Sequence, residues 1–405
     1  MKKLSVGIIG GGAAGFFAAI HAAQGGARVV LLEKTSKVLS KVKISGGGRC
    51  NVTHAAFENS QLLKGYPRGE KFLKKVFASF SVNDTISWFE SRGVKLKVEA
   101  DGRMFPVSDS SQSIIDALES SAQKAGVELV FNFPVTQIKP SDKGWEVVSG
   151  QKSLFFDKLI IASGGNPKKE GFDFIKGLGH PIIAPIPSLF TFNTPQEPIR
   201  QLTGISTPDA YVRLEGTKLA YRGPLLITHW GLSGPAVLKL SAFGAQWLFD
   251  QQYKAKAHIR WVHDFTEENL VHNLQQFKNQ HPKKKITSNA LFGIPSRLWE
   301  HLCEKAEIKE SILWQEISKK ALNKLVQNLF CYIVALEGKT TFKEEFVTAG
   351  GVDLAEVSPE TMESKVHKGL YFAGEVLNID GITGGYNFQA AWSTGFLAGK
   401  SVIKD

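Results

Sequence analysis

A glycine-rich turn between two apolar runs constrains this chain more than any other feature. Residues 4–9 form a short apolar run, and Gly10-Gly11-Gly12-Ala13-Ala14-Gly15 follows it directly. An alanine-rich stretch, 16–24, leads to a second apolar run at 29–32, which is followed by Glu33. This order predicts a strand, a tight turn, a helix and a second strand, and it is typical of folds that bind a dinucleotide.

Each glycine of the turn has its own expected task. Gly10 permits the tight turn, Gly12 lets a diphosphate approach the backbone, and Gly15 lets the helix pack closely on the strand. The helix N-terminus offers free N–H groups to the anion, and Glu33 can accept hydrogen bonds from ribose hydroxyls. A purely structural glycine turn is the alternative, and the pattern does not separate FAD from NAD. The contacts expected here are Gly10, Gly12, Ala14, Gly15, Glu33 and Lys34.

The carboxyl-terminal end favours FAD. Residues 370–373 are apolar and lead directly into Gly374 and Glu375, and a second glycine-rich turn precedes a small-residue helix at 390–399. In flavoproteins whose chain returns to the first sheet, such an element contacts the ribityl chain and the diphosphate, and the helix N-terminus can face the flavin. A further apolar run, 158–162, also ends in a glycine turn. The contacts expected from these elements are Ser163, Gly164, Gly374, Glu375, Gly385, Tyr386, Asn387 and Gln389.

A second GxGxxG–strand–acid unit is absent from the sequence. We therefore expect NAD(P)H, as the electron donor, to dock transiently beside the flavin rather than to occupy a domain of its own. The sequence also contains no HExxH motif or paired-cysteine site, so we expect no metal centre.

The chain is basic, and its positive charge is unevenly distributed. It has 49 Lys and Arg against 38 Asp and Glu, a formal net charge of +11. The stretch from Lys34 to Lys75 holds ten basic and two acidic residues. Such a surplus suits a polyanionic partner such as RNA. The alternatives are a solvated basic helix face and neutralisation of the cofactor diphosphate by Lys41, Lys43 and Arg49.

Three features predict a cytoplasmic location. Cys50, Cys303 and Cys331 are widely spaced and odd in number, which argues against a disulfide framework and favours a reducing compartment. Glycines and polar residues interrupt the first apolar stretch, which therefore suits a strand and turn better than a secretory signal. No window reaches about 18 uninterrupted apolar residues, so we expect no membrane-spanning segment.

A longer motif carries a family resemblance. Ile44-Ser45-Gly46-Gly47-Gly48-Arg49-Cys50-Asn51-Val52-Thr53 resembles the SGGGRCN signature of the BaiN/RdsA-like (aminoacetone-oxidase-like) family of bacterial FAD-dependent oxidoreductases. Four further blocks are similar to the same family, at 102–106, 228–235, 347–352 and 369–399. The resemblance implies FAD contacts at Lys41, Ser45, Gly47, Gly48, Arg49, Asn51 and Val135.

The resemblance also implies an α/β fold in several parts. We expect a split Rossmann-like FAD-binding domain at 1–189 and 341–405, similar to that of fumarate reductases and flavocytochromes. An inserted β-barrel-like domain is expected at 190–265 with roughly 330–345, and a helical lobe at 266–330.

Two local patterns add detail to this division. Apolar runs at 127–135, 145–149 and 153–156 predict a meander of strands before the strand at 158–162. In the lobe, helical spacing of Leu270, Leu274 and Phe277 predicts a buried face, and His281-Pro282-Lys283-Lys284-Lys285 predicts an exposed loop.

Three side chains are candidates for proton transfer or substrate orientation. His229, in a turn-rich segment, titrates near neutral pH and can donate a proton. Cys50 can also donate one, although the neighbouring Arg49 should lower the thiol pKa and so favour the thiolate. Arg103 can orient an anionic or carbonyl group. A structural role is the alternative for each of the three.

Three functions are compatible with the sequence. The resemblance implies a reductase that adds hydride from reduced flavin to an activated C=C bond, in a uridine of large-subunit ribosomal RNA to form dihydrouridine. The second function is reduction or oxidation of a small-molecule enone, steroid-like ketone or amine, and the third is non-enzymatic RNA binding. The basic surplus favours the RNA substrate, as do four possible stacking surfaces, Tyr66, Trp230, Tyr386 and His229.

Overall fold

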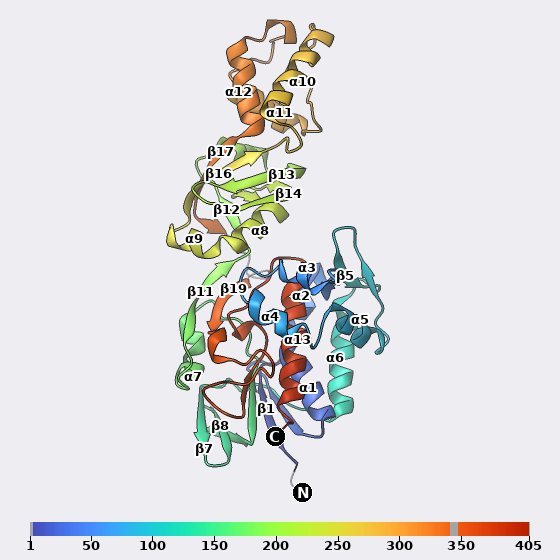
Figure 1. The fold of residues 1–405 in the computed structure, drawn as a ribbon, viewed down its shortest axis with the longest axis vertical. Coiled ribbons are helices and arrows are strands. Elements are labelled where there is room, and N and C mark those ends of the chain that lie inside the picture. Colours follow the sequence, from blue (N-terminus) through green and yellow to red (C-terminus); the bar gives the residue numbers. More distant parts are fainter. Residues whose placement is uncertain (1–2, 341–346, 405) are drawn as a thin grey trace. The chain divides into compact units, whose positions relative to one another are not determined.

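The computed structural model describes residues 3–340 and 347–404, and the chain divides into two compact units. The first unit combines Met1–Ser188 with Lys343–Asp405, and the second is Leu189–Phe342. Both ends of the chain therefore build the first unit, and the second is inserted between them (Figure 1).

A five-stranded parallel sheet forms the centre of the first unit. Its strands lie in the order β20 (Leu370–Phe372), β10 (Lys158–Ile161), β1 (Ser5–Ile9), β2 (Arg28–Leu32) and β6 (Glu128–Val130). The central strands are short apolar runs because the sheet is buried on both faces. The strand from the carboxyl-terminal part of the chain pairs with β10, which confirms the predicted split Rossmann-like α/β fold.

Helices α1 (Ala13–Gln24) and α13 (Tyr386–Ser401) contact strands of this sheet. The other helices of the first unit are, in chain order, α2 (Ser40–Gly48), α3 (Asn59–Leu63), α4 (Glu70–Val76), α5 (Val82–Glu90), α6 (Ser111–Ala125) and α7 (Asp173–Lys176).

Two glycines of α13 allow its backbone to pack directly against the backbone of α1. A Cβ atom added to Gly395 would lie 2.6 Å from the carbonyl oxygen of Ala14, and one added to Gly399 would lie 2.5 Å from that of Ala18. Larger residues at either position would separate the two backbones. Because a four-residue step on one helix matches a four-residue step on the other, the helices run in the same direction.

Smaller sheets complete the described part of the first unit. They are β3 (Thr53–His54), β5 (Arg103–Pro106) and β4 (Leu96–Val98); β7 (Gln137–Ser141), β8 (Gly144–Ser149) and β9 (Lys152–Phe156); and β11 (Ile182–Ser188) with β19 (Val347–Val352). The predicted start of the meander, 127–135, was wrong. Part of this run is β6, which pairs in parallel with β2, and the meander begins at β7.

A seven-stranded antiparallel sheet forms the second unit together with a group of helices. The strand order is β17 (Tyr332–Glu337), β16 (Lys254–Arg260), β13 (Ser206–Leu214), β14 (Ala220–Ile227), β15 (Gly231–Ser233), β12 (Thr191–Asn193) and β18 (Lys339–Thr340). Strands β17 and β18 are the two end strands of this order, since β17 pairs with β16 and β18 pairs with β12. Only Gly338 separates these two end strands in the chain. The sheet therefore curves back on itself, which confirms the predicted β-barrel-like insertion.

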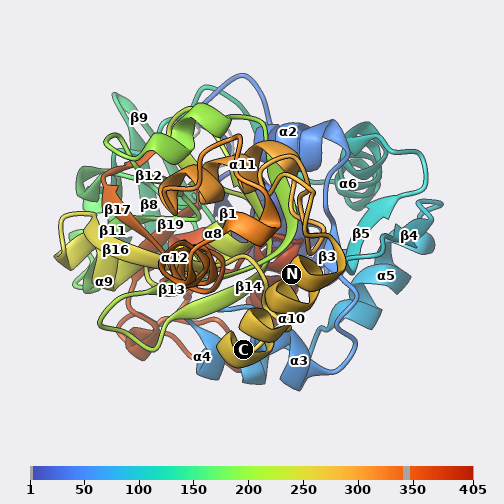
Figure 2. The ribbon, with the colours of Figure 1, turned by 90° about the horizontal axis from the view of Figure 1, so that it is seen from above.

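The lobe of this unit consists of α10 (Glu267–Gln280), α11 (Ser296–Lys305) and α12 (Lys319–Phe330), and α8 (Pro235–Phe243) and α9 (Ala245–Asp250) precede it (Figures 1 and 2). Leu270 and Leu274 are fully buried and Phe277 packs against the same core, as their spacing predicts. The loop at 281–285 is largely exposed, which confirms that prediction as well.

The imidazole of His21 on α1 is buried among aromatic rings. It is 6% exposed and packs edge-on against Phe396. Neither ring nitrogen has a hydrogen-bond partner in the part of the chain that the structure describes. Burial, with smaller contributions from the positive charges of Lys400 and Arg92, lowers the pKa of His21 to about 3.

This low pKa predicts a loss of stability in acid. The unfolded chain binds a proton at His21 below about pH 6.5, whereas the folded protein does not until about pH 3. The free energy of unfolding should therefore fall on acidification through this window, by up to about 1.4 kcal/mol per pH unit. His21→Phe keeps a ring in the cluster and removes the titration. Urea unfolding at neutral and mildly acidic pH should therefore show a smaller loss of stability for this variant.

His272→Gln is the matched control, because His272 is an exposed histidine on α10. This variant should keep the pH dependence of the natural protein. If His21→Phe lost as much stability in acid as the natural protein, burial of a neutral His21 would not be the cause.

Candidate functional site

The glycine turn after β1 combines close packing with open space. Gly10 has φ +112°, and a Cβ atom there would lie 2.3 Å from the carbonyl oxygen of Ala162. A Cβ atom on Gly15 would lie 1.9 Å from the carbonyl oxygen of Gly10. At Gly12, by contrast, an added Cβ would meet no atom within 4 Å, and no side chain caps the helix. The N-terminus of α1 therefore faces space in which a phosphate group can reach its N–H groups.

Glu33 follows β2 beside this turn. One carboxylate oxygen accepts the N–H of Gly11 at 2.9 Å, and the other accepts the N–H and the hydroxyl of Thr35, each at 2.9 Å. These bonds fix the carboxylate, and its remaining lone pairs can accept ribose hydroxyls. Lys34, which is exposed, follows Glu33 directly. Phe133, two residues before Val135, donates its N–H to the carbonyl oxygen of Glu33 at 2.9 Å.

The ends of β10 and β20 provide two more glycine turns at the same edge of the sheet. Gly164 has φ +77°, an added Cβ there would meet no atom within 4 Å, and Ser163 before it is exposed. Gly374 has φ +76°, and a Cβ there would lie 2.7 Å from the Cβ of Ala14. Because both strands run parallel to β1, their carboxyl ends meet at the edge that carries the first turn. The fold thus brings together predicted cofactor residues from three distant segments.

The signature motif forms an open turn within α2. The backbone leaves helical conformation at Ser45, and Gly46, Gly47 and Gly48 all have positive φ. A Cβ atom added to Gly47 or Gly48 would meet no atom within 4 Å. Glycine is therefore required here by backbone conformation and leaves a surface without side chains.

Gly385, at the start of α13, packs against the segment that follows this motif. A Cβ atom on Gly385 would lie 2.4 Å from the carbonyl oxygen of Thr53. The amide of Asn51 links the same parts, since its nitrogen donates to the carbonyl oxygen of Thr53 and its oxygen accepts the N–H of Gly385, each at 3.0 Å. Because Gly395 lies beside Ala14, α13 begins about eight residues, or roughly 12 Å, before α1 along their common direction.

Two polar residues of α13 already have partners within the protein. The side chain of Asn387 bonds to both the N–H and the carbonyl oxygen of Gly381, at 2.8 and 3.0 Å. Gln389 is fully buried and accepts the hydroxyls of Thr53 and Thr85, at 2.6 and 3.0 Å. These bonds give both side chains a structural role in holding the start of α13, beside the cofactor contact predicted for them.

The basic residues predicted at the cofactor also have acidic partners. Lys41 lies 2.7 Å from Glu375, whose charge raises the pKa of this lysine. Arg49 lies 2.6 Å from Glu99 and 3.5 Å from Asp109. Carboxylates therefore balance part of the positive charge that the sequence places here.

Cys50 differs from its prediction. Its thiol is fully buried, and burial raises its pKa to about 12, while a hydrogen bond with Ser45 lowers it only partly. The expectation that Arg49 would lower this pKa was wrong, because desolvation dominates and the guanidinium bonds to Glu99 instead. At neutral pH Cys50 is a protonated thiol, which excludes a thiolate nucleophile in this state.

The other two candidates lie in different units. Arg103, on β5, bonds to Asp101 at 2.7 Å and to Glu99 at 3.0 Å, so its guanidinium is already held by two acids. His229 is an exposed residue of the second unit, in the turn before β15, and its ring lies 4.3 Å from that of Trp230. Its role toward the turns of the first unit stays a prediction.

His54 is a residue that sequence reasoning missed. Its Nδ1 lies 3.0 Å from the carbonyl oxygen of Gly384, and its ring stacks on Tyr386 with centroids 4.8 Å apart. A Cβ atom added to Gly102 would lie 2.7 Å from its Nε2. A titratable ring thus lies at the N-terminus of α13. Its place directly after the signature motif was the available signal.

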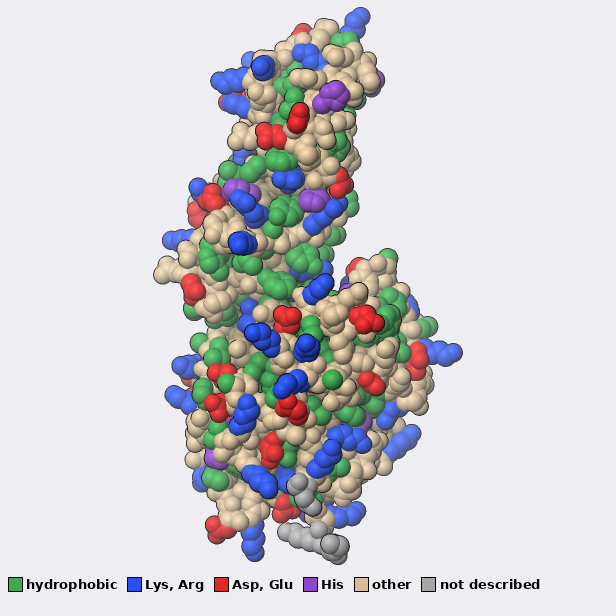
Figure 3. Space-filling model, viewed as in Figure 1, with side chains coloured by type: hydrophobic (Ala, Val, Ile, Leu, Met, Phe, Trp, Pro, Cys, Tyr) green, Lys and Arg blue, Asp and Glu red, His purple; other side chains and the backbone are tan. Residues whose placement is uncertain are grey.

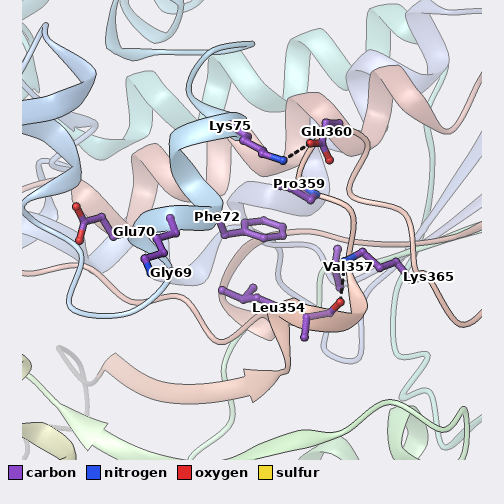
Figure 4. A pocket seen from close by; sticks show the side chains of 11 residues that line it. Gly69, Glu70, Phe72, Lys75, Leu354, Val357, Pro359, Glu360 and Lys365 are labelled. Carbon is purple, nitrogen blue, oxygen red and sulfur yellow. Dashed lines mark hydrogen bonds and ion pairs between the residues drawn. The ribbon is translucent and has the colours of Figure 1, made fainter.

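A shallow pocket of about 590 Å³ lies between α4 and residues 354–365. Phe72, Leu354 and Val357 line it, and the ion pair of Lys75 and Glu360, at 2.6 Å, lies at its edge (Figure 4). None of the predicted cofactor residues lines this pocket.

The described residues offer neither a metal site nor a membrane-spanning helix. They contain no group of three His, Cys, Asp or Glu side chains that could hold a metal ion. None of the helices among them has the length and apolar character needed to cross a membrane.

Comparisons with known proteins cover almost the whole chain. The family model described as HI0933-like protein Rossmann domain matches residues 4–401. A 3-dehydro-bile acid delta(4,6)-reductase of Clostridium scindens is 30% identical, over 98% of this chain and 99% of the relative. A ribosomal RNA dihydrouridine synthase of Escherichia coli is 31% identical, over 100% and 99%. A crystal structure of a 3-ketosteroid-delta4-(5alpha)-dehydrogenase from Rhodococcus jostii aligns with 100% of this chain and 97% of its own, with a TM-score of 0.51 and 16% identity, which supports the fold.

Proposed function

Because this chain belongs to the HI0933-like family of Rossmann-domain proteins and is an FAD-dependent oxidoreductase, we propose that it reduces an activated carbon–carbon double bond. The preferred substrate is a uridine of large-subunit ribosomal RNA, and the product is dihydrouridine. The observation that carries the flavin part of this proposal is the meeting of three glycine turns at one edge of the parallel sheet.

The residues at this edge fit an FAD molecule. The open N-terminus of α1 at Gly12 would hold the diphosphate, and Glu33 would hold the adenosine ribose. The turns at Gly164 and Gly374 would border the ribityl chain, and the start of α13, roughly 12 Å ahead of α1, would lie toward the flavin ring. When bound, FAD supplies the hydride for the double bond, and NAD(P)H is the donor that we propose for its reduction.

The protein must also supply a proton to the second carbon of the double bond. His54 is suited to this task because the carbonyl oxygen of Gly384 fixes its ring at the start of α13. The neutral thiol of Cys50 and the exposed His229 are the alternative donors. Arg103, held by Glu99 and Asp101, would orient the substrate carbonyl.

Two features support RNA as the substrate. The relative from Escherichia coli, which is named a ribosomal RNA dihydrouridine synthase, matches the chain over its whole length. A uracil must leave the base stack before its ring can reach a buried cofactor, which costs a few kcal/mol. Lysine and arginine contacts to RNA phosphates can offset that cost, and the net charge of +11 supports such contacts.

The test of this proposal is deletion of the gene followed by mass spectrometry of nucleosides from the large-subunit ribosomal RNA. Dihydrouridine should be lost on deletion and should return when the natural gene is re-expressed. Re-expression of Gly12→Asp, designed to prevent FAD binding, should not restore it. Unchanged dihydrouridine in the deletion strain would refute the RNA substrate.

The second candidate is reduction or oxidation of a small molecule. It is supported by the relative from Clostridium scindens, which is named for a bile-acid substrate and matches 98% of this chain. Purified protein reduced by NADH or NADPH should then return to oxidised flavin when an enone is added. Rapid reoxidation by an enone, together with unchanged dihydrouridine in the deletion strain, would favour this candidate. A flavin that neither substrate reoxidises would favour non-enzymatic RNA binding.

A further inference from the structure

The end of the helical lobe that is remote from the barrel-like sheet carries exposed lysines that the proposed cofactor site does not use. Helix α10 leads away from the sheet and ends at Gln280, whereas α12 begins at Lys319 and returns to β17 (Figure 1). The loop after α10 and the start of α12 therefore share this end. Six exposed lysines lie on this loop, on the segment between α11 and α12 and at the start of α12, and form what we call the lysine tip: Lys283, Lys284, Lys285, Lys309, Lys319 and Lys320.

Backbone and side-chain bonds hold the segments of the lysine tip together. The N–H of Trp314 donates to the carbonyl oxygen of Lys284 at 2.9 Å, and residues 285 and 313 form a β-bridge. Lys278, near the end of α10, reaches the carbonyl oxygen of Ile317 at 3.5 Å. The buried indole of Trp314 packs against Phe277 beneath these contacts. The lysines thus project from a folded surface rather than from a loose tail.

Acidic side chains do little to neutralise the lysine tip. Only Glu310 and Glu316 lie on the same segments, and a carboxylate oxygen of Glu316 accepts the N–H of Leu313 at 2.9 Å. Glu307, the next acid before them, forms its ion pair with Lys324 of α12, and Lys320 of the tip adds only a smaller charge effect on this carboxylate. Within residues 3–340 and 347–404, no carboxylate forms an ion pair with any of the six lysines. Figure 3 shows basic side chains protruding at this end of the lobe.

The composition of the surface indicates the kind of partner. None of the exposed large hydrophobic side chains of the described chain lies between 278 and 320, so the surface offers no apolar anchor for a lipid bilayer. Lysines on three neighbouring segments instead present several exposed positive charges. The N-terminus of α12, capped by the hydroxyl of Ser318, adds partial positive charge at the same place. Such a surface suits an extended chain of phosphates.

We propose that the lysine tip docks RNA through its phosphate backbone. This inference rests on the proposed function, because it identifies the surface that holds the ribosomal RNA while one uridine enters the cofactor site. The contacts are to phosphates, so they supply affinity and are independent of base sequence.

The test compares two triple variants of the full-length protein with FAD bound. Lys283→Gln, Lys284→Gln and Lys285→Gln together remove half of the lysine tip. The matched control replaces three exposed lysines of the first unit, Lys143→Gln, Lys152→Gln and Lys176→Gln. Binding of an unmodified large-subunit ribosomal RNA transcript is measured over a range of salt concentrations, together with flavin reduction by NAD(P)H and dihydrouridine formation.

The tip variant should bind the transcript roughly tenfold more weakly than the control near physiological salt. The slope of log Kd against log salt should fall by about two, because each lost phosphate contact on a single strand contributes about 0.7. Flavin reduction and the thermal midpoint should stay the same in both variants.

The outcomes separate this inference from the proposed function. If the natural protein makes dihydrouridine and both variants bind RNA equally well, the docking surface is wrong and the function stands. If the tip variant alone loses RNA binding but no protein makes dihydrouridine, the docking surface stands and the function is wrong. Binding to anionic phosphatidylglycerol vesicles in place of RNA, or to neither, would overturn the docking proposal.

Discussion

Gly12→Asp is expected to give a folded protein that has lost its flavin. Gly12 has φ −92° and ψ −172°, which any residue adopts, and an added Cβ meets no atom within 4 Å. Folding should therefore be unaffected. The new carboxylate would occupy the space before the N-terminus of α1, take up its free N–H groups and repel the diphosphate. We expect FAD affinity to fall by about 100-fold or more, which corresponds to about 2.7 kcal/mol.

The flavin absorbance of the purified protein and a calorimetric titration with FAD measure this effect. Gly177→Asp is the matched control, because Gly177 also has negative φ and open space around an added Cβ. The control should be yellow and bind FAD as the natural protein does. A Gly12→Asp protein that retained one tightly bound FAD would show that the diphosphate does not lie at this helix.

The glycine turns were predictable because their chemistry is local. The tight turn at Gly10 and the close packing at Gly15 depend on residues a few positions away and on the strand and helix that flank them. Spacing along the sequence was therefore enough to predict β1, α1 and β2. The same reasoning found the turn at Gly374, and the pairing of β20 with β10 then placed it in the first sheet.

The ion pairs of the basic residues could not be predicted in the same way, because their acidic partners are distant in sequence. Arg49 pairs with Glu99 and Lys41 with Glu375, across separations of 50 and 334 residues. From the sequence alone, Arg49 was predicted to lie beside the Cys50 thiol and at the cofactor diphosphate, but not beside Glu99. The fold turns the guanidinium toward Glu99 and buries the thiol, so desolvation sets the direction of the pKa shift.

Short apolar runs were the other source of error. Residues 128–130 lie in an apolar run that was assigned to the meander, whereas the meander begins at 137–141, where only Ile138 is apolar. Residues 128–130 pair with β2, and the pairing partner of a strand depends on the whole sheet rather than on its own residues. His54 was missed for a related reason, since its contact with Gly384 joins segments that are 330 residues apart.

Arg68→Met is expected to destabilise the first unit strongly, by about 3–5 kcal/mol. Asp380 is fully buried, and both of its carboxylate oxygens bond to the guanidinium of Arg68. The hydroxyl of Ser188 donates to the same carboxylate at 2.8 Å. Without Arg68, the buried negative charge loses its cation. Lys75→Met, which breaks the exposed pair with Glu360, is the matched control and should cost no more than about 1 kcal/mol.

A second substitution tests whether the buried charge is the cause. Adding Asp380→Asn to Arg68→Met removes the unpaired carboxylate and should recover much of the lost stability, because an amide is less costly to bury than an anion. Asp380→Asn alone should cost less than Arg68→Met, since the Arg68 side chain is 20% exposed and can reach water. Urea unfolding in saturating FAD, followed by tryptophan fluorescence, measures all of these variants. If the double variant were as unstable as Arg68→Met, lost packing of the arginine stem rather than an uncompensated carboxylate would explain the effect.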